Sequence, residues 1–175
     1  MKRLNFGAML ALAAVACLVV PTVASAEFFA AALSGAQEVP ANTSFASGAF
    51  TFNFQNSGVP AAGQNVYTLS YSGLEGIVQQ AHIHIGQPGV NGGITIWLCG
   101  TAALPGPAGT PVCPQAGTVT DQITPAKVLG IAGQRVNPGG LAEVINNAFR
   151  RGAAYVNVHT TVLPGGEIRG LIHEP

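Results

Sequence analysis

Short runs of alternating apolar and polar residues, bounded by glycine- and proline-containing turns, constrain this chain most strongly. In residues 45–54, phenylalanine occupies every second position from Phe50 to Phe54. Successive strand residues point to opposite faces, so this spacing directs one apolar face at a core. Comparable runs occur at 28–33, 66–72, 77–85, 94–99, 155–163 and 167–173. Seven strands with one polar face each predict an all-β fold of two sheets packed face to face.

One segment, residues 140–152, has helical periodicity instead. Its apolar residues recur three and four positions apart, as on one face of a helix: Leu141, Val144, Ile145, Ala148 and Phe149. Asn137-Pro138 predicts the start of the helix as cap and first-turn proline. Arg150 and Arg151 in the last turn would interact favourably with the helix dipole, and Gly152 predicts the C-terminal end of the helix. We therefore expect one short amphipathic helix crossing between the sheets.

The first 26 residues have the three parts of an export signal. Lys2 and Arg3 form a charged start, residues 8–20 are apolar, and residues 24–26 are small. The apolar run is shorter than the roughly 20 residues that span a bilayer, which favours cleavage over anchoring. The sequence thus predicts an exported protein, periplasmic or secreted, with a single mature domain over 27–175.

The charge of the mature chain limits its partners. Without Lys2 and Arg3, five of the seven basic residues remain against seven acidic ones. Nucleic acids and anionic membranes bind clustered lysine and arginine. We therefore expect no nucleic-acid partner and no membrane insertion of the mature chain.

Two cysteines, Cys99 and Cys113, remain once Cys17 is removed with the export signal. In an oxidising compartment such a pair normally forms a disulfide. A metal or redox pair would favour closer spacing, such as C-x-x-C. The sequence therefore predicts a Cys99–Cys113 disulfide that pins the loop between them.

Histidines gather on the polar faces of two predicted strands. In AHIHIG (81–86), His82 and His84 alternate with apolar residues, and His159 occupies the same kind of position in 155–163. Two rings on one strand and a third from another can share one metal ion, for which imidazole suits copper and zinc and the stability order favours Cu(II). A half-exposed strand face is equally an ordinary place for histidine, so spacing alone leaves both interpretations open.

The end of the chain reads as a hairpin. A three-residue loop at 164–166 keeps the apolar and polar faces of its two strands matched. This register sets His159 opposite Leu171 and places His173 diagonally from His159, roughly 7–8 Å away.

Four stretches occur in order along nearly the whole mature chain: LSGAQEVP (33–40), AHIHIGQPGVNG (81–92), AYVNVHT (154–160) and PGGEIRG (164–170). With them the chain resembles the chordin (CHRD) domain family of exported bacterial proteins. The resemblance implies a Greek-key β-sandwich of immunoglobulin-like or Cu/Zn superoxide dismutase-like type. It also implies a binding module, because the animal relatives in chordin act in extracellular protein binding.

AHIHIG is also similar to the copper-binding His-x-His strand of Cu/Zn superoxide dismutases. A dinuclear site of that type takes an aspartate and more histidines than the mature chain carries: His82, His84, His159 and His173. The resemblance therefore implies at most a mononuclear site, with copper as first and zinc as second choice, on His82, His84 and His159. Glu38 and Glu167 are outside candidates for an oxygen ligand.

No other catalytic constellation stands out. The sole aspartate of the mature chain, Asp121, would have to orient a histidine in a Ser/His/Asp site, and no G-x-S-x-G motif occurs. Glu167 and Arg169 share a face and are expected to pair with neighbours across the sheet.

Three functions follow from these features. The first is an exported, non-enzymatic binding module with a copper or zinc site. The second is a protein-interaction or matrix module without metal, and the third is a mononuclear dismutase-like enzyme.

Overall fold

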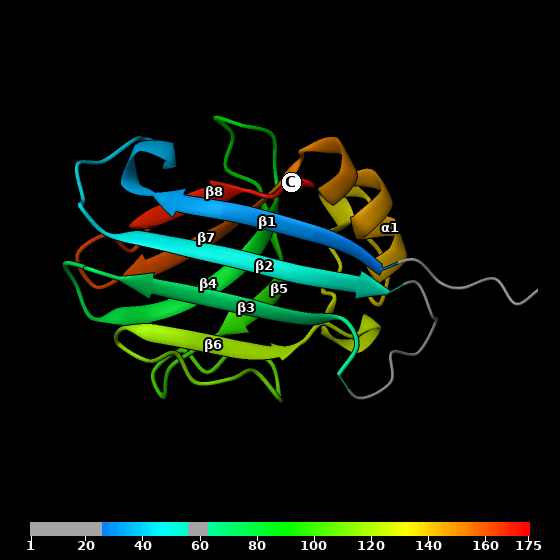
Figure 1. The fold of residues 1–175 in the computed structure, drawn as a ribbon, viewed down its shortest axis with the longest axis horizontal. Helices are drawn as coiled ribbons and strands as arrows, with labels where there is room; N and C mark the ends of the chain where they lie inside the picture. The colour runs from blue at the N-terminus through cyan, green and yellow to red at the C-terminus, as the bar shows by residue number, and fades with distance from the viewer. Residues whose placement is uncertain (1–25, 56–62) are drawn as a thin grey trace, which may run out of the picture.

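A computed structural model describes residues 26–55 and 63–175 and is built mainly of β-strands (Figure 1). The strands are β1 Ala26–Ser34, β2 Ser47–Gln55, β3 Val66–Ser72, β4 Val78–Ile85, β5 Gly93–Cys99, β6 Gly117–Gln122, β7 Ala154–Thr160 and β8 Ile168–Leu171. They form one antiparallel sheet in the order β5-β4-β7-β8-β1-β2-β3-β6. The predicted export signal lies outside the described residues except for Ala26, which begins β1.

The sheet folds over into a nearly closed sandwich. Strands β1, β2, β3 and β6 cross the front of Figure 1, and β4, β5 and β7 lie behind them. The terminal strands of the sheet, β5 and β6, contact each other. Strand β7 returns to pair with β4, and β6, which is hydrogen-bonded to β3, lies beside β5 where the sheet closes, so these four strands follow a Greek-key order. The predicted all-β sandwich is confirmed.

Strand β6 was not predicted. Only Val119 of its six residues is buried, so the segment lacks an alternating apolar signal. It becomes a strand because its backbone pairs with β3, with Val119 opposite Leu69 and Asp121 opposite Tyr67. The structure thus has eight strands in the described residues, where the pattern predicted seven.

The core lies between the two halves and uses the predicted faces of β2 and β3. The alternating aromatic and leucine residues of both strands are at most 4% exposed: Phe50, Phe52, Phe54, Tyr67, Leu69 and Tyr71. Phe29 of β1 packs on Phe52 and on the edge of Phe149 from the helical segment. Burial of these side chains is the main force that closes the sandwich.

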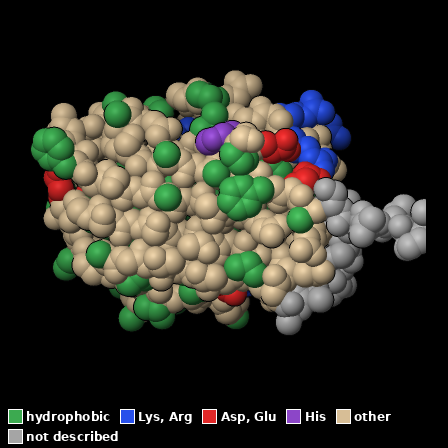
Figure 2. All heavy atoms as spheres, in the orientation of Figure 1, with side chains coloured by type: hydrophobic (Ala, Val, Ile, Leu, Met, Phe, Trp, Pro, Cys, Tyr) green, Lys and Arg blue, Asp and Glu red, His purple; other side chains and the backbone are tan. Residues whose placement is uncertain are grey.

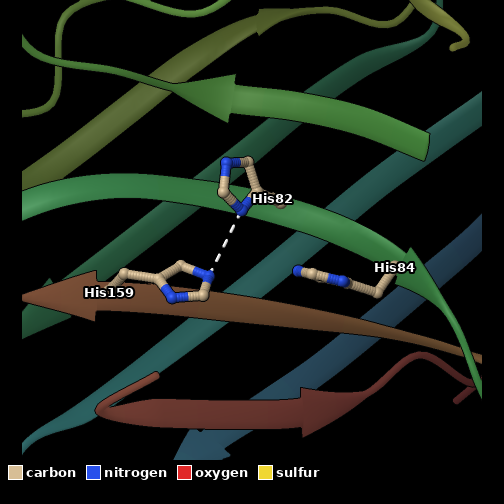
Figure 3. A group of neighbouring side chains, drawn as sticks. All are labelled: His82, His84 and His159. Carbon is tan, nitrogen blue, oxygen red and sulfur yellow. Dashed lines mark hydrogen bonds between the residues drawn. The ribbon is translucent and has the colours of Figure 1, made fainter. Parts of the chain in front are cut away.

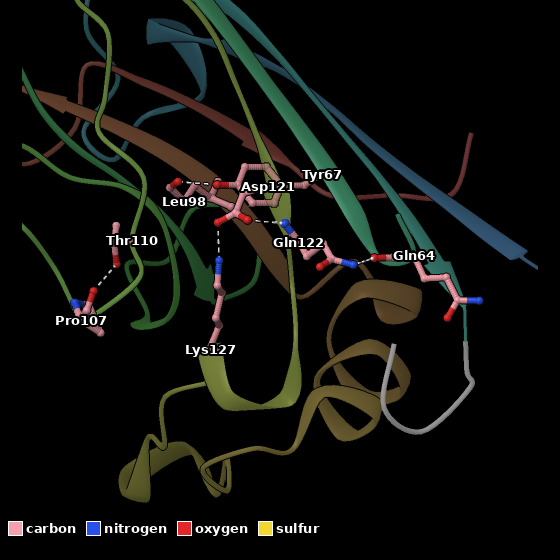
Figure 4. Close-up of polar contacts among 8 residues, drawn as sticks. All are labelled: Gln64, Tyr67, Leu98, Pro107, Thr110, Asp121, Gln122 and Lys127. Atoms are coloured by element: carbon pink, nitrogen blue, oxygen red, sulfur yellow. Dashed lines mark hydrogen bonds and ion pairs between the residues drawn. The ribbon is translucent and has the colours of Figure 1, made fainter. Parts of the chain in front are cut away.

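Polar contacts tie the seam between β3, β5 and β6 (Figure 4). The Tyr67 hydroxyl of β3 donates to the Leu98 carbonyl oxygen of β5. Burial, and secondarily the charge of Asp121, raise the pKa of the Tyr67 hydroxyl, so it remains a donor. Asp121 itself forms an ion pair with Lys127. The only aspartate of the chain therefore belongs to this seam.

The predicted helix is present but shorter. Helix α1 runs over Leu141–Asn147 and is followed by a 3-10 turn, η4 Phe149–Arg151. Gly152 ends the segment in the left-handed conformation, with φ 61°. Three further 3-10 turns are η1 Gly35–Gln37, η2 Pro125–Lys127 and η3 Ala132–Gln134.

The predicted helix start is wrong. The cap residue is Gly140, because Asn137 lies in a turn in which its carbonyl oxygen accepts the Gly140 N–H. Arg150 and Arg151 do lie in the last turn of η4, and Arg150 pairs in addition with Glu27 at the start of β1.

One strand face was also assigned wrongly at its start. Strict alternation over 77–85 predicts that Ile77 lies on the apolar face, opposite to the face of His82 and His84, but Ile77 is 68% exposed and Val78 is in the core. A register shift between Val78 and Gln80 in the pairing with β7 reverses the alternation before Ala81. From Ala81 onward the predicted faces of β4 hold.

The hairpin register is wrong by four positions. Strand β7 ends at Thr160, and β8 pairs with it through Val158 opposite Ile168. The chain turns early because the Thr160 hydroxyl accepts the Leu163 N–H and donates to Glu167 Oε2. His173 therefore does not lie diagonally across from His159 as predicted. It forms an isolated bridge with Ala30 instead.

The predicted disulfide joins Cys99 to Cys113, with Cα atoms 5.0 Å apart. It closes the loop that follows β5. Within the described residues, no helix has the length and apolar character of a membrane span.

We expect Cys99→Ser/Cys113→Ser to lower the free energy of unfolding by about 2 to 3 kcal/mol, because the bond restricts the unfolded chain over a separation of 14 residues. Urea unfolding of oxidised wild type and variant would measure the loss. Equal midpoints would contradict a stabilising role.

Candidate metal centre

The structure brings together the three predicted histidines. Strands β4 and β7 are neighbours, with His82 opposite Asn157 and Gln80 opposite His159. One ligand nitrogen from each of His82, His84 and His159 lies within 4.8 Å of the others. Figure 3 shows the three rings converging from the two strands. Nitrogens bound to one ion at about 2.0 Å lie about 3.3 Å apart at tetrahedral angles, so a small ring movement would let them share an ion.

The cluster is buried, which corrects the expectation of a surface site. His82 is 0% exposed, His84 8% and His159 7%. Ala81 and Ile83 face the core between the sheets, so the histidines lie on the other face of β4. Loops cover that face, and all seven residues of β7 are buried as a result.

Aromatic rings flank the cluster. The Trp97 ring of β5 meets His82 nearly perpendicularly, with centroids 4.3 Å apart. Tyr155 of β7 stacks on His84 with centroids 4.8 Å apart and ring planes 4° from parallel. The Arg169 guanidinium of β8 lies 3.4 Å from the centroid of the Tyr155 ring. These contacts fix His82 and His84 and exclude water from their sides.

The loop between β4 and β5 forms the cover. The Gly92 N–H donates to the Tyr155 hydroxyl (3.1 Å), and Arg169 donates to the Val90 carbonyl oxygen (2.7 Å) and to Asn91 Oδ1 (3.1 Å). A Cβ at Gly92 would lie 1.6 Å from the Ile85 carbonyl oxygen. Glycine is therefore required where this loop closes on the strand.

Backbone carbonyls set the tautomers of two histidines. His84 Nδ1 lies 3.0 Å from the Gly92 carbonyl oxygen, and His159 Nδ1 lies 2.9 Å from that of Pro164. A carbonyl oxygen only accepts, so each Nδ1 carries the proton and each Nε2 presents a lone pair. Backbone contacts of this kind orient histidine ligands in metal sites.

The His82 ring is the third of the cluster, and the three rings together have more lone pairs than nearby hydrogen-bond donors. His82 Nδ1 lies 3.2 Å from His159 Nε2, so in the metal-free protein it donates its hydrogen there. The Nε2 atoms of His82 and His84 are buried and have no hydrogen-bond partner in the described part of the chain. Buried polar atoms are rarely left unpaired. A cation between the rings would take the lone pair of His84 Nε2 and, with the His82 proton moved to Nε2, those of His82 Nδ1 and His159 Nε2, so the residues present fit a metal ion.

The environment keeps the rings neutral. Burial, followed by the charges of His159 and His84, lowers the pKa of His82 to about 2. Burial lowers the pKa of His84 to about 4. The hydrogen bond to the Gly92 carbonyl raises this pKa in part, and the charges of His159 and Arg169 lower it further. Burial also lowers the pKa of His159, opposed by the Pro164 carbonyl. Neutral imidazole is the form that binds metals.

The predicted oxygen ligands lie elsewhere. Glu38 is buried, accepts a hydrogen bond from Asn157 Nδ2 (2.7 Å) and is not among the clustered ligand atoms. Burial raises its pKa to about 7 despite Arg169. His173 is exposed and is likewise outside the cluster.

Glu167 is fully buried and accepts hydrogen bonds from Ser44 Oγ, Glu75 N and Thr160 Oγ1 at 2.7 to 2.8 Å. Burial raises its pKa, but these hydrogen bonds and one from Gly76 outweigh it and lower the pKa overall. Its carboxylate therefore organises the loops at this end of the sandwich.

The residues that support the cluster were not predicted to do so. Trp97 lies in no motif, and Tyr155 and Asn157 lie with His159 in AYVNVHT, where only alternation along β7 indicates the face that they share. Glycine is the one usable signal. At Gly166, where φ is 134°, a Cβ would lie 2.4 Å from Asn157 Nδ2, which explains a glycine in PGGEIRG.

Fold and site together define a Greek-key β-sandwich with a buried three-histidine cluster between two neighbouring strands and their covering loops. The model of the CHRD domain matches residues 29–172, nearly the whole described chain. The chain therefore belongs to the CHRD domain family. No curated protein and no solved structure gave a significant match.

Proposed function

We propose that this protein is an exported CHRD-domain binding module that holds a single copper ion, with zinc as second choice, on His82, His84 and His159. One observation carries the proposal: ligand nitrogens from three neutral imidazoles lie within 4.8 Å of one another, and the buried Nε2 of His84 has no hydrogen-bond partner among the described residues. Membership of the CHRD family and the disulfide support a role outside the cytoplasm.

The residues fit copper in detail. His84 Nε2 and His159 Nε2 are held as lone-pair donors by the Gly92 and Pro164 carbonyls, and His82 Nδ1 already faces His159. Burial favours binding over turnover, because a substrate would have little access to an ion beneath Trp97 and the loop that ends at Gly92. An ion bound here would stabilise the fold by linking β4 to β7.

Metal-free protein is expected to bind one equivalent of copper, and His82→Ala/His84→Ala is expected to weaken binding at least hundredfold, because one ring alone remains. Isothermal titration would measure both, with copper supplied as Cu(II) in air and as Cu(I) under anaerobic reduction.

His173→Ala is the matched control, since His173 is exposed and outside the cluster. It should bind as wild type does. Equal copper affinity of wild type and the double variant would remove the metal site and leave a protein-interaction module as the surviving function.

A further inference from the structure

Resting on the proposed copper site, we infer that the cluster selects monovalent copper, Cu(I), over Cu(II) and Zn²⁺. The inference concerns the charge and coordination number that this pocket accepts, and it follows from three features: a neutral ligand set, a buried location and a positively charged neighbour.

The ligand set brings no negative charge. The cluster of possible ligands consists of His82, His84 and His159, without a carboxylate or thiolate among the described residues. Cys99 and Cys113 are joined in the disulfide. A divalent ion would therefore keep both of its positive charges, whereas Cu(I) would keep one.

Burial makes that difference large. The cost of moving an ion into a medium of low dielectric constant rises with the square of its charge, so a divalent ion pays four times the penalty of a monovalent ion of similar size. His82 is fully buried, and the two other rings are at least 92% buried.

The neighbouring charges do not compensate. Arg169 lies over the Tyr155 ring, which stacks on His84, so only one ring separates a fixed positive charge from the cluster. Glu38 is the carboxyl linked to the site through Asn157, and it interacts with Arg169 as well. Glu167 is occupied by the hydroxyls of Ser44 and Thr160.

Coordination number points the same way. Zinc sites take four ligands, and Cu(II) prefers a square-planar or tetragonal set. Cu(I) has a closed d shell and is stable with three nitrogen ligands. The three rings come from two strands and are covered by Trp97 and the loop that ends at Gly92, which leaves little room for added water ligands.

The test is competition for each ion separately. Metal-free protein would be titrated with Cu(I) against bicinchoninate under anaerobic reduction, and with Cu(II) and Zn²⁺ against nitrilotriacetate. We expect Cu(I) to bind at least a thousandfold more tightly than Cu(II). The corresponding shift raises the reduction potential of the bound couple by about 180 mV over that of free copper in the same buffer.

The variant Asn157→Asp would add a negative charge beside the neutral ligand set. Asn157 lies opposite His82, and its Oδ1 is buried without a hydrogen-bond partner among the described residues, so an aspartate would place a carboxylate beside the cluster. The ratio of Cu(I) affinity to Cu(II) affinity should fall at least tenfold in this variant, because the carboxylate strengthens Cu(II) binding. Because this variant could fold poorly, the potential of the wild-type protein provides an independent measure.

The outcomes separate the two proposals. Copper binding that depends on His82 and His84, but with Cu(II) or Zn²⁺ bound as tightly as Cu(I), would overturn this inference and leave the proposed function in place. Failure to bind copper in either oxidation state would overturn both.

Discussion

Acidification of metal-free protein from pH 6.5 to pH 4 is expected to lower the free energy of unfolding by about 3 kcal/mol. The folded pKa of His82 is about 2 and that of His84 about 4, both below the unfolded value of 6.5. The unfolded chain therefore binds protons that the folded chain refuses, and stability falls as the pH drops below 6.5. Each histidine contributes a loss of about 2.5 to 3 kcal/mol over this range.

Glu38 acts in the opposite direction. Its pKa is about 7 in the folded protein and 4.5 in the unfolded chain, so between these pH values the folded protein binds a proton that the unfolded chain does not. Acidification from pH 6.5 to 4 therefore raises the contribution of Glu38 to the free energy of unfolding by about 2.4 kcal/mol. The net loss from His82, His84 and Glu38 is about 3 kcal/mol, and the lowered pKa of His159 adds to it.

Urea unfolding at half-unit pH steps, in the presence of a chelator, would measure this dependence. The His173→Ala variant should follow the wild-type curve because that ring is exposed. A bound copper ion would occupy the lone pairs and reduce the loss. Constant stability between pH 6.5 and 4 in the metal-free protein would show that the rings are not buried as neutral groups.

Replacement of Glu167 by alanine is expected to cost about 4 kcal/mol. Its carboxylate is fully buried and accepts hydrogen bonds from Ser44, Glu75 and Thr160, and each hydrogen bond to a charged group contributes about 1.5 to 3 kcal/mol. Glu167→Gln should cost less, because the amide oxygen still accepts from two of these groups. Chemical unfolding at pH 7 would rank the variants.

Glu174→Ala is the control, since Glu174 is exposed near the end of the chain. The advantage of wild type over Glu167→Gln should shrink as the pH falls below 4.5, because the folded pKa of Glu167 is lowered and its stabilising charge is lost on protonation. A cost below 1 kcal/mol for Glu167→Ala would mean that water replaces the carboxylate.

Alternation predicted most of the sandwich because each strand buries one face. The pattern of Phe50 to Phe54 placed β2 correctly, and the helix was found from its apolar spacing. The prediction failed where polar contacts decide the local structure. Strand β6 has one buried residue, and the hairpin register depends on a Thr160 hydroxyl that bonds Leu163 and Glu167.

The three histidines of the candidate site were predicted, but the burial of the site was not. Alternation placed His82, His84 and His159 on the non-core faces of their strands, and the pairing of β4 with β7 brings them together. The polar face was expected to be exposed, but Tyr155, Arg169 and the loop that ends at Gly92 cover it. The stability order alone favoured Cu(II), whereas burial without a carboxylate leads us to infer Cu(I).

The sequence by itself determined the class of fold, the disulfide and which three histidines lie on the non-core faces of two strands, because alternation and spacing are properties of the chain. The family followed from the resemblance of four sequence stretches. Only the tertiary structure decided that these rings are buried, which nitrogen of His84 and His159 bears the proton, and that Glu38 and Glu167 lie outside the cluster. Burial and hydrogen bonding depend on loops brought from distant positions, and no local pattern records which face such loops will cover.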